Sequence, residues 1–139
     1  MEQENNDRKH IFSGAPWESR VGYCRAVRAG DTIYLSGTTA VDNEGRVKGE
    51  DDPYQQARHA LEIMRSALEE AGSGLEDVVR TRIYVTDIDS WEAVGKAHAE
   101  YFSEIRPATT MVEVPRLIDP GMLVEIEAVA VIGGGSLSS

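Results

Sequence analysis

Two segments of the chain repeat their apolar residues every three or four positions, which is the spacing of one helix face. The first segment begins at Pro53, with Asp52 before it as an N-cap and Gln55 as the capping-box partner, and it ends at Gly72. Its apolar stripe consists of Ala57, Leu61, Met64, Leu68 and Ala71. A second segment, residues 89–102, opens on another acidic capping pair. The pattern predicts a helix in each segment.

Other parts of the chain alternate apolar and polar residues, which is the period of a β-strand. Between residues 23 and 39, two short runs of β-branched and aromatic residues flank Ala29-Gly30-Asp31, and this arrangement predicts a hairpin. Further strands are predicted over 80–86, 110–114 and 122–132, with a short one at Val47. This order of elements predicts an α+β domain with a single mixed sheet and both helices packed on one face.

The last predicted strand carries apolar residues on both faces. One face presents Val124, Ile126, Ala128, Ala130 and Ile132. The other face mixes Leu123, Val129 and Val131 with Glu125 and Glu127. If the helices cover only one side of the sheet, the second apolar set needs another cover, and we expect a partner subunit to provide it. The alternative is that these residues are partly exposed in a single chain.

The chain has 139 residues, of which 41% are hydrophobic and 27% are charged, and this suits one globular domain. We expect the domain to span 11–132, with flexible ends at 1–10 and 133–139, because neither end carries periodic apolar residues. No apolar run approaches the roughly 18 residues that a membrane span needs, and the polar N-terminus lacks the apolar stretch of a secretory signal. We therefore expect a cytoplasmic protein that does not interact with membranes.

Charge bears on the choice of partner. The 24 acidic and 14 basic side chains give a formal net charge of −10 at pH 7. Such a charge repels phosphate backbones unless a local basic patch intervenes, and the longest basic cluster is only Arg8-Lys9. We therefore do not expect nucleic acid as a partner.

The residue types that hold metals and nucleotide cofactors show no ligand spacing. His10, His59 and His98 lie in different segments, and Cys24 is the only cysteine, which excludes an internal disulfide. The sequence also has no GxGxxG or Walker-type loop. We expect neither a metal nor another cofactor.

Two acidic residues of the last strand are candidates for chemistry. Glu125 and Glu127 point to the same side of the strand, where a subunit interface would partly desolvate a carboxylate and suit it to act as a general base. The alternative is an ion pair with Arg80 or Arg82 on a neighbouring strand. Tyr23 offers a phenolic hydroxyl to a ligand or packs as a strand aromatic.

Four stretches of the chain resemble one protein family. They are GYCRAV at 22–27, IYLSG at 33–37, RPATTMVEV at 106–114 and VEIEAVA at 124–130. Together they are similar to the Rid proteins, also called YjgF/YER057c/UK114. The resemblance implies a chorismate-mutase-like α+β fold and a homotrimer with three small-molecule clefts between neighbouring subunits.

The resemblance also implies a reaction. The family archetype is a cofactor-free deaminase that hydrolyses imines and enamines of the 2-aminoacrylate type to 2-keto acids and ammonia. By this likeness a glutamate at Glu125 positions the attacking water, while Tyr23 and the pair Ser36-Gly37 line the cleft. An arginine of the archetype clamps the substrate carboxylate at two points.

This chain departs from the family pattern at the arginine. Thr109 stands at that position and offers one neutral donor in place of a charged fork, while Met111 replaces a nearby cysteine. Arg106 is the first candidate to take over the role, although the following proline favours an extended backbone there. Arg25 and Arg82 rank behind it.

Two classes of function follow from these residues. The first is a deaminase-like hydrolase in which Glu125 orients water against a small imine, enamine or related C–N bond, with little turnover of 2-aminoacrylate itself. The alternative is a non-catalytic trimer that binds a small metabolite or regulates a partner. A third function, RNA cleavage, is sometimes attached to the family and suits the charge poorly.

Overall fold

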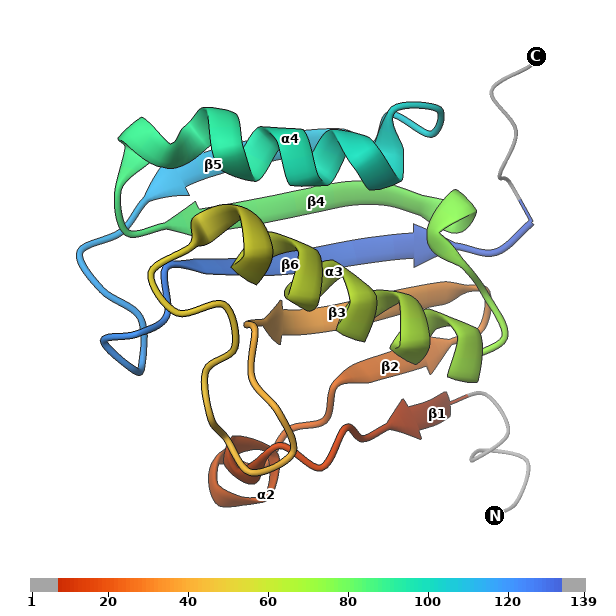
Figure 1. Ribbon diagram of the computed structural model, residues 1–139. Coiled ribbons are helices and arrows are strands. Elements are labelled where there is room, and N and C mark those ends of the chain that lie inside the picture. The colour runs from red at the N-terminus through yellow and green to blue at the C-terminus, as the bar shows by residue number, and fades with distance from the viewer. Residues whose placement is uncertain (1–7, 134–139) are drawn as a thin grey trace.

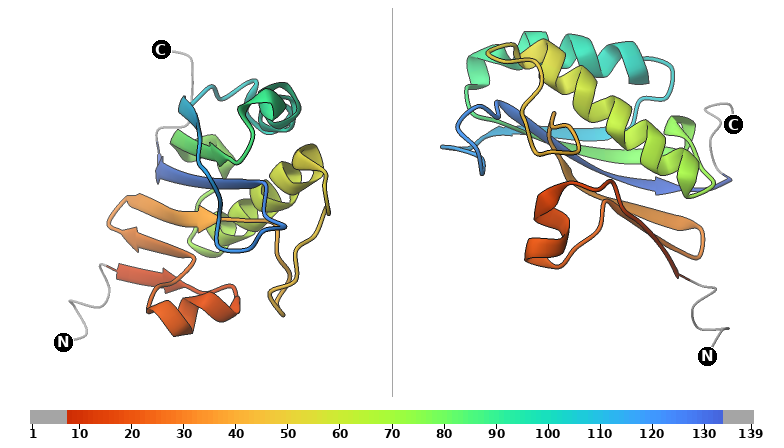
Figure 2. Two further views of the ribbon diagram at one scale, coloured as in Figure 1. Left: turned by 90° about the vertical axis from the view of Figure 1, so that its left-hand side faces the viewer. Right: turned by 60° about the horizontal axis from the view of Figure 1, so that its bottom comes forward.

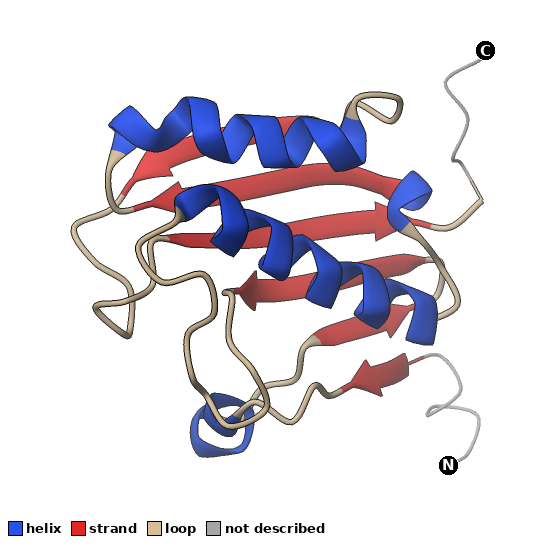
Figure 3. Cartoon of the chain, in the orientation of Figure 1, coloured by secondary structure: helices blue, strands red, loops and turns tan. Residues whose placement is uncertain are grey.

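The protein is described by a computed structural model over residues 8–133. Six strands form one sheet in the order β1-β2-β3-β6-β4-β5 (Figures 1 and 3). The strands are β1 (Arg8–Ile11), β2 (Ala26–Ala29), β3 (Thr32–Thr38), β4 (Val78–Val85), β5 (Ala108–Glu113) and β6 (Val124–Val131). The helices are α2 (Pro16–Val21), α3 (Pro53–Glu70) and α4 (Trp91–Phe102), with short 3-10 turns η1 (Leu75–Asp77) and η2 (Ile88–Ser90).

The sheet is mixed, as the sequence predicts. Neighbouring strands are antiparallel except β4 and β5, which are parallel and joined through α4. A parallel pair requires such a crossover, because a tight turn cannot return the chain to the same end of the sheet. Strand β6 lies in the middle, between β3 and β4, although it is the last strand in the chain.

Helix α3 shows how the local sequence sets an element. The side chain of Asp52 accepts a hydrogen bond from the backbone N–H of Gln55 at 3.1 Å, and Pro53 occupies the first turn, where no N–H is needed. After the helix, Gly72 adopts a left-handed φ of +88°, which favours glycine. No helix within residues 8–133 is long and apolar enough to cross a membrane.

The core lies between the sheet and helices α3 and α4, which pack on the same face (Figures 1 and 2). The stripe of α3 is buried there, and so are Ile33, Leu35, Ile83, Val124 and Ile126 from the strands. On the other face of the sheet, Tyr34 is 54% exposed and Val131 38% exposed. The prediction that two helices pack on one face is confirmed. The short helix α2 borders a hollow on the other face, beside Val27 and Ser36, and the rest of that face is uncovered by the described residues.

The N-terminal part differs from the prediction. Arg8–Ile11 forms β1, which pairs with β2 from Arg8 opposite Ala29 to Ile11 opposite Ala26, so residues 8–10 are not a free tail. The rest of the two predicted flexible ends, 1–7 and 134–139, lies outside the described residues. Helix α2 was not predicted either, because its six residues are too few to show a helical period. The predicted strand at Val47 is a single bridge to Val41.

Candidate functional site

A cleft of about 360 Å³ opens where β3 ends and β6 begins. Its lining includes Tyr23, Ser36, Gly37 and Glu125, four of the residues that the family resemblance assigns to one cleft. Arg25 also lines it. Because the neighbours of Glu125 on β6, Val124 and Ile126, are buried under the helices, Glu125 points to the open side of the sheet.

Gly37 lets Glu125 enter the cleft. A Cβ added at Gly37 would stand 2.9 Å from Cδ of Glu125 and closer still to its Oε2. The carboxylate therefore lies directly over the glycine backbone, at a distance that no other residue type permits without moving it. The strand is also irregular here, because the pairing of β3 with β6 shifts register between Leu35 and Thr38.

Glu125 is half-buried, and its pKa is raised above the ordinary value of 4.5. Burial is the largest cause, the negative charge of Glu127 adds to it, and the positive charge of Arg25 opposes both. A carboxylate whose pKa moves toward neutrality takes up a proton from water more readily than an ordinary surface glutamate. The position is suited to a general base.

Arg25 is the cation of this cleft. The residue is 5% exposed, and its Nη1 donates to the carbonyl oxygen of Gly37 at 2.9 Å and to Oγ1 of Thr38 at 3.1 Å. The guanidinium carbon lies 5.5 Å from the ring centroid of Tyr23. The structure thus brings Arg25 to Tyr23, Gly37 and Glu125, whereas the sequence ranks Arg106 before it.

Glu18 balances the charge of Arg25. Its Oε2 lies 3.4 Å from Nε of Arg25, an ion pair whose geometry falls short of a hydrogen bond. Glu18 is 4% exposed, and it accepts hydrogen bonds from the backbone N–H and the hydroxyl of Ser13. Sequence reasoning missed Glu18, although an acidic residue in the first turn after Pro16 is a signal for a helix start.

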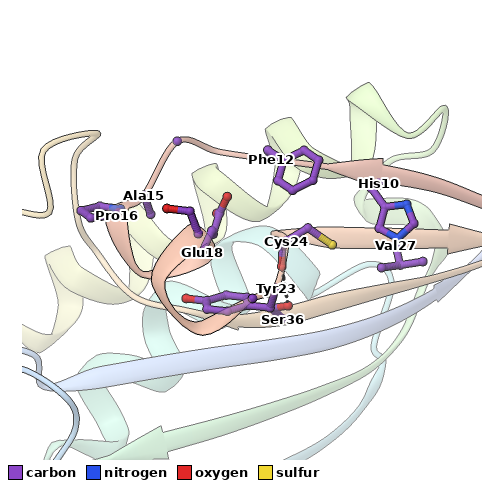
Figure 4. A pocket seen from close by; sticks show the side chains of 12 residues that line it. His10, Phe12, Ala15, Pro16, Glu18, Tyr23, Cys24, Val27 and Ser36 are labelled. Atoms are coloured by element: carbon purple, nitrogen blue, oxygen red, sulfur yellow. Dashed lines mark hydrogen bonds between the residues drawn. The ribbon is translucent and has the colours of Figure 1, made fainter.

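A second hollow of about 720 Å³ adjoins the cleft on the other side of Tyr23 and Ser36. Figure 4 shows its lining, with Phe12 above Cys24 and His10 above Val27. The hydroxyl of Ser36 donates to the carbonyl oxygen of Cys24 at 2.7 Å, and the buried thiol of Cys24 contacts the carbonyl oxygen of Ala26 at 3.4 Å. This hollow is the larger of the two but does not reach Glu125, so we place the chemistry in the smaller cleft.

The second acidic residue of the strand is engaged elsewhere. Glu127 accepts from Nη1 of Arg82 at 3.1 Å and from the hydroxyl of Tyr84 at 2.9 Å. This hydrogen bond is the first cause of the raised pKa of Tyr84. The predicted cross-strand ion pair is confirmed for Glu127 and not found for Glu125, and it occupies Arg82.

The structure places Thr109 and Met111 on β5, away from the cleft. Strands β6 and β4 separate β5 from β3, so one chain does not bring these residues to Glu125. The Thr109 hydroxyl lies 2.7 Å from Oγ1 of the buried Thr81, which lies 2.9 Å from Nε2 of His98. Burial lowers the pKa of His98. Met111 packs against the core.

Arg106 does not line the cleft either. It follows α4 with a left-handed φ of +56°, in contrast to the extended backbone that the sequence suggests. Its backbone N–H donates to the carbonyl oxygen of Phe102 at 2.8 Å, and its Nε donates to that of Ser103 at 3.0 Å. These bonds satisfy the carbonyls at the end of the helix, which explains the unusual φ.

The cleft offers side chains with a charge or an ionisable proton. Among residues 8–133, no three histidine, cysteine, aspartate or glutamate side chains gather in a way that would hold a metal ion. The groups that reach the cleft with a charge or an ionisable proton are Tyr23, Arg25 and Glu125. They supply a phenol, a guanidinium and a carboxylate, a set suited to acid–base chemistry on a small polar molecule.

Comparison with known proteins finds a matching family model, similar sequences and similar solved structures. A sequence model of the family described as Endoribonuclease L-PSP matches residues 14–132. An uncharacterized protein of Streptomyces coelicolor is 41% identical over 125 residues, which cover 90% of this chain and 92% of the relative. A solved structure from Mycobacterium tuberculosis, a member of the YjgF/YER057c/UK114 family, is 51% identical, with a TM-score of 0.82 over 90% of this chain and 99% of that one. A Rid-family protein of unknown function from Yersinia pestis is 31% identical, with a TM-score of 0.80 over 90% and 99% of the two chains.

Proposed function

This chain belongs to the YjgF/YER057c/UK114, or Rid, family, and on that premise we propose that it hydrolyses the C–N bond of a small imine or enamine in the cleft around Glu125. The observation that carries the proposal is the position of Glu125. It is half-buried with a raised pKa, and it lies over the Gly37 backbone in a cleft shared with Tyr23, Ser36 and Arg25. The resemblance gives this glutamate the role of positioning water.

The proposed reaction needs one base. Ionised Glu125 accepts a proton from water while the water oxygen bonds to the imine carbon, and the C=N electron pair moves to nitrogen. Glu125 passes this proton to the nitrogen, which gives a neutral carbinolamine and restores the carboxylate. Glu125 then takes the hydroxyl proton and delivers it to the nitrogen as the C=O bond forms and the C–N bond breaks, so the products are a carbonyl compound and ammonia. An enamine enters as its imine tautomer.

The direct test compares Glu125→Gln with the matched variant Glu127→Gln, which removes a carboxylate on the same strand face. Small imines, including 2-iminopropionate formed from 2-aminoacrylate in situ, serve as substrates, and ammonia release is measured. Glu125→Gln is expected to lose at least about 100-fold in rate, in the range typical of a general base, and Glu127→Gln much less. Hydrolysis that persists in Glu125→Gln would contradict the proposed role.

We propose further that the functional unit is a homotrimer with the cleft between subunits. Two observations support it. The open sheet face carries partly exposed apolar residues such as Tyr34 and Val131, and Thr109 and Met111 lie too far along the sheet to join the cleft of their own chain. Light scattering on the purified protein tests the assembly. A monomer at working concentration would exclude it.

A second candidate function is non-catalytic binding of a small metabolite. It is favoured by Thr109, because the position of the archetypal arginine is filled by a hydroxyl that hydrogen-bonds to Thr81. Native mass spectrometry of the purified protein distinguishes the two functions, since a compound released unchanged supports carriage. The name of the matched family also raises RNA cleavage, which the net charge of −10 disfavours. Binding to single-stranded RNA at low salt would reopen that possibility.

A further inference from the structure

The three guanidinium nitrogens of Arg25 differ in whether they can still donate a hydrogen bond to a ligand. Nη1 uses both its protons, one on the carbonyl oxygen of Gly37 and one on Oγ1 of Thr38. Nε faces the carboxylate of Glu18 at 3.4 Å. Nη2 makes no hydrogen bond to any residue in the range 8–133. Within that range, Nε of Arg25 is the one side-chain nitrogen or oxygen atom that is both fully buried and without a hydrogen-bond partner, so Nη2 is not fully buried. Nη2 therefore keeps contact with solvent.

This pattern limits how Arg25 can bind a ligand. A two-point clamp on a carboxylate uses two guanidinium nitrogens, either Nη1 with Nη2 or Nε with Nη2. The first choice breaks the hydrogen bonds of Nη1 to Gly37 and Thr38. The second requires the ligand to reach Nε, which is fully buried and faces the carboxylate of Glu18. The remaining possibility is a contact from Nη2 alone.

The charges around the cleft point the same way. The buried carboxylate of Glu18 offsets the charge of Arg25, and Glu125 adds a second carboxylate on the cleft wall. Together these groups leave no net positive charge to hold a doubly charged anion. Burying such an anion beside Glu125 would be unfavourable, because charges removed from water need compensating partners.

We propose that Arg25 contacts the ligand through Nη2 alone, so that the cleft selects a small neutral or singly charged molecule by one oxygen acceptor, without a two-point carboxylate clamp. The inference rests on the proposed function for the place where the ligand binds. It goes beyond it by stating which ligands the cleft accepts. The threonine at position 109 then needs no other arginine to restore a two-point clamp, because Arg25, just before β2, supplies a different contact.

Ligand-observed NMR titrations of the whole protein test the proposal with three probes of similar size. Pyruvate carries a carboxylate, pyruvamide is its neutral counterpart, and malonate is a dianion at pH 7.5. Wild-type protein is expected to bind pyruvate and pyruvamide with Kd values within about threefold of each other, and malonate at least about tenfold more weakly. Arg25→Lys, which keeps the charge opposite Glu18 but not the fork, should weaken both favoured probes by about tenfold.

Several outcomes would overturn the inference. Pyruvate binding about tenfold or more tightly than pyruvamide would reveal a two-point clamp. Unchanged affinities in Arg25→Lys, or no binding of either favoured probe to wild type, would show that Nη2 is not the contact. Arg82→Lys is the control, since Arg82 pairs with Glu127 outside the cleft lining. If Arg25→Lys does not fold, the wild-type ratio alone decides.

These measurements are separate from the test of catalysis. The ratio of pyruvate to pyruvamide affinity does not depend on turnover, and loss of hydrolysis in Glu125→Gln does not depend on Arg25. A clamp-like ratio with intact Glu125-dependent hydrolysis would reject only the inference about Arg25. The expected ratio without any hydrolysis would leave a binding protein with the ligand preference proposed here.

Discussion

Two polar clusters lie on opposite sides of the central strand β6, and they pair their buried polar side chains in different ways. The first, the Arg25 cluster, joins Glu18, Arg25 and Gly37 beside Glu125 and is charged. The second, the Thr81 cluster, joins Thr81, His98 and Thr109 by hydrogen bonds at 2.9 and 2.7 Å, and none of its members is a carboxylate or guanidinium.

The difference shows where this chain keeps its charge. In the Thr81 cluster, the hydroxyls and the imidazole satisfy one another against the core beneath α4. In the Arg25 cluster, an ion pair is buried, yet Arg25 still lines the cleft. The cleft thus has a guanidinium on its lining although position 109 is a threonine. It is that of Arg25, from the segment just before β2.

Breaking the buried ion pair should have the greatest effect on stability. Arg25→Met leaves the carboxylate of Glu18 buried without its partner and should cost about 3–5 kcal/mol of unfolding free energy. Adding Glu18→Gln to Arg25→Met should recover much of this loss. Urea unfolding of the single and double variants measures both, and additive losses would show that the two side chains do not interact.

A methyl group at Gly37 should separate function from stability. Gly37→Ala places a Cβ against the Glu125 carboxylate, which can swing away at little cost to the fold but leaves its position over the backbone. Hydrolysis or probe binding should drop by about tenfold or more, equivalent to about 1.4 kcal/mol. Gly95→Ala is the control, because a Cβ there meets nothing within 4 Å in α4. It should stabilise the helix by about 0.5–1 kcal/mol. Equal activity in both variants would contradict the close approach seen at Gly37.

The neutral cluster should matter for stability and not for the ligand. Thr81→Val keeps the shape of a fully buried side chain but removes the hydroxyl between His98 and Thr109. We expect a loss of about 1–2 kcal/mol, because both partners lose a hydrogen bond and water reaches only the exposed Thr109. Thermal unfolding measures the loss. A change in probe affinity larger than the change seen in Arg25→Lys would reverse the comparison of the two clusters.

The smallest expected effect concerns the charge of Glu125. Its pKa is raised on folding, so the folded state holds its proton more tightly than the unfolded state does, and stability falls as pH rises from about 4.5 through the raised pKa. Glu125→Gln removes this loss and should stabilise the protein at pH 7 by at most about 1 kcal/mol, because solvent still screens the half-exposed group. Unfolding between pH 4 and 8 measures it. A variant that is less stable than wild type across that range would contradict a raised pKa.

The same ionisation governs activity under the proposed mechanism. Only ionised Glu125 accepts a proton from water, so the rate should decrease as pH falls through its raised pKa. Above the pKa of Glu125, the ionisation of this side chain should no longer change the rate. The pH profile of kcat/KM gives the value, and a profile that stays flat down to pH 4.5 would show that another group acts as the base.

Much of the fold follows from local pattern. The stripe of α3, its Asp52 cap and the alternation along β4 and β6 specify elements that bury one face, and the structure confirms them. Short elements escape this reasoning. Strand β1 and helix α2 have four and six residues, too few for a period to show, and pairing with β2 is what holds β1 in place.

The family resemblance predicts that Tyr23, Ser36, Gly37 and Glu125 share one cleft, and the structure brings them together. It leaves the choice of arginine open. The choice among Arg25, Arg82 and Arg106 required the tertiary structure, because each is a guanidinium whose role depends on which carboxylate or carbonyl it meets. Arg82 meets Glu127, and Arg106 meets the end of α4.

Sequence pattern determines which face of each element is buried, since burial of apolar surface follows the spacing of residues along one helix or strand. It does not determine which polar side chains meet, since those contacts join segments far apart in the chain. Glu18, Arg25, Gly37 and Glu125 come from α2, the approach to β2, β3 and β6. Only the order of strands in the folded sheet places the Arg25 guanidinium beside Glu125 and leaves Thr109 two strands away.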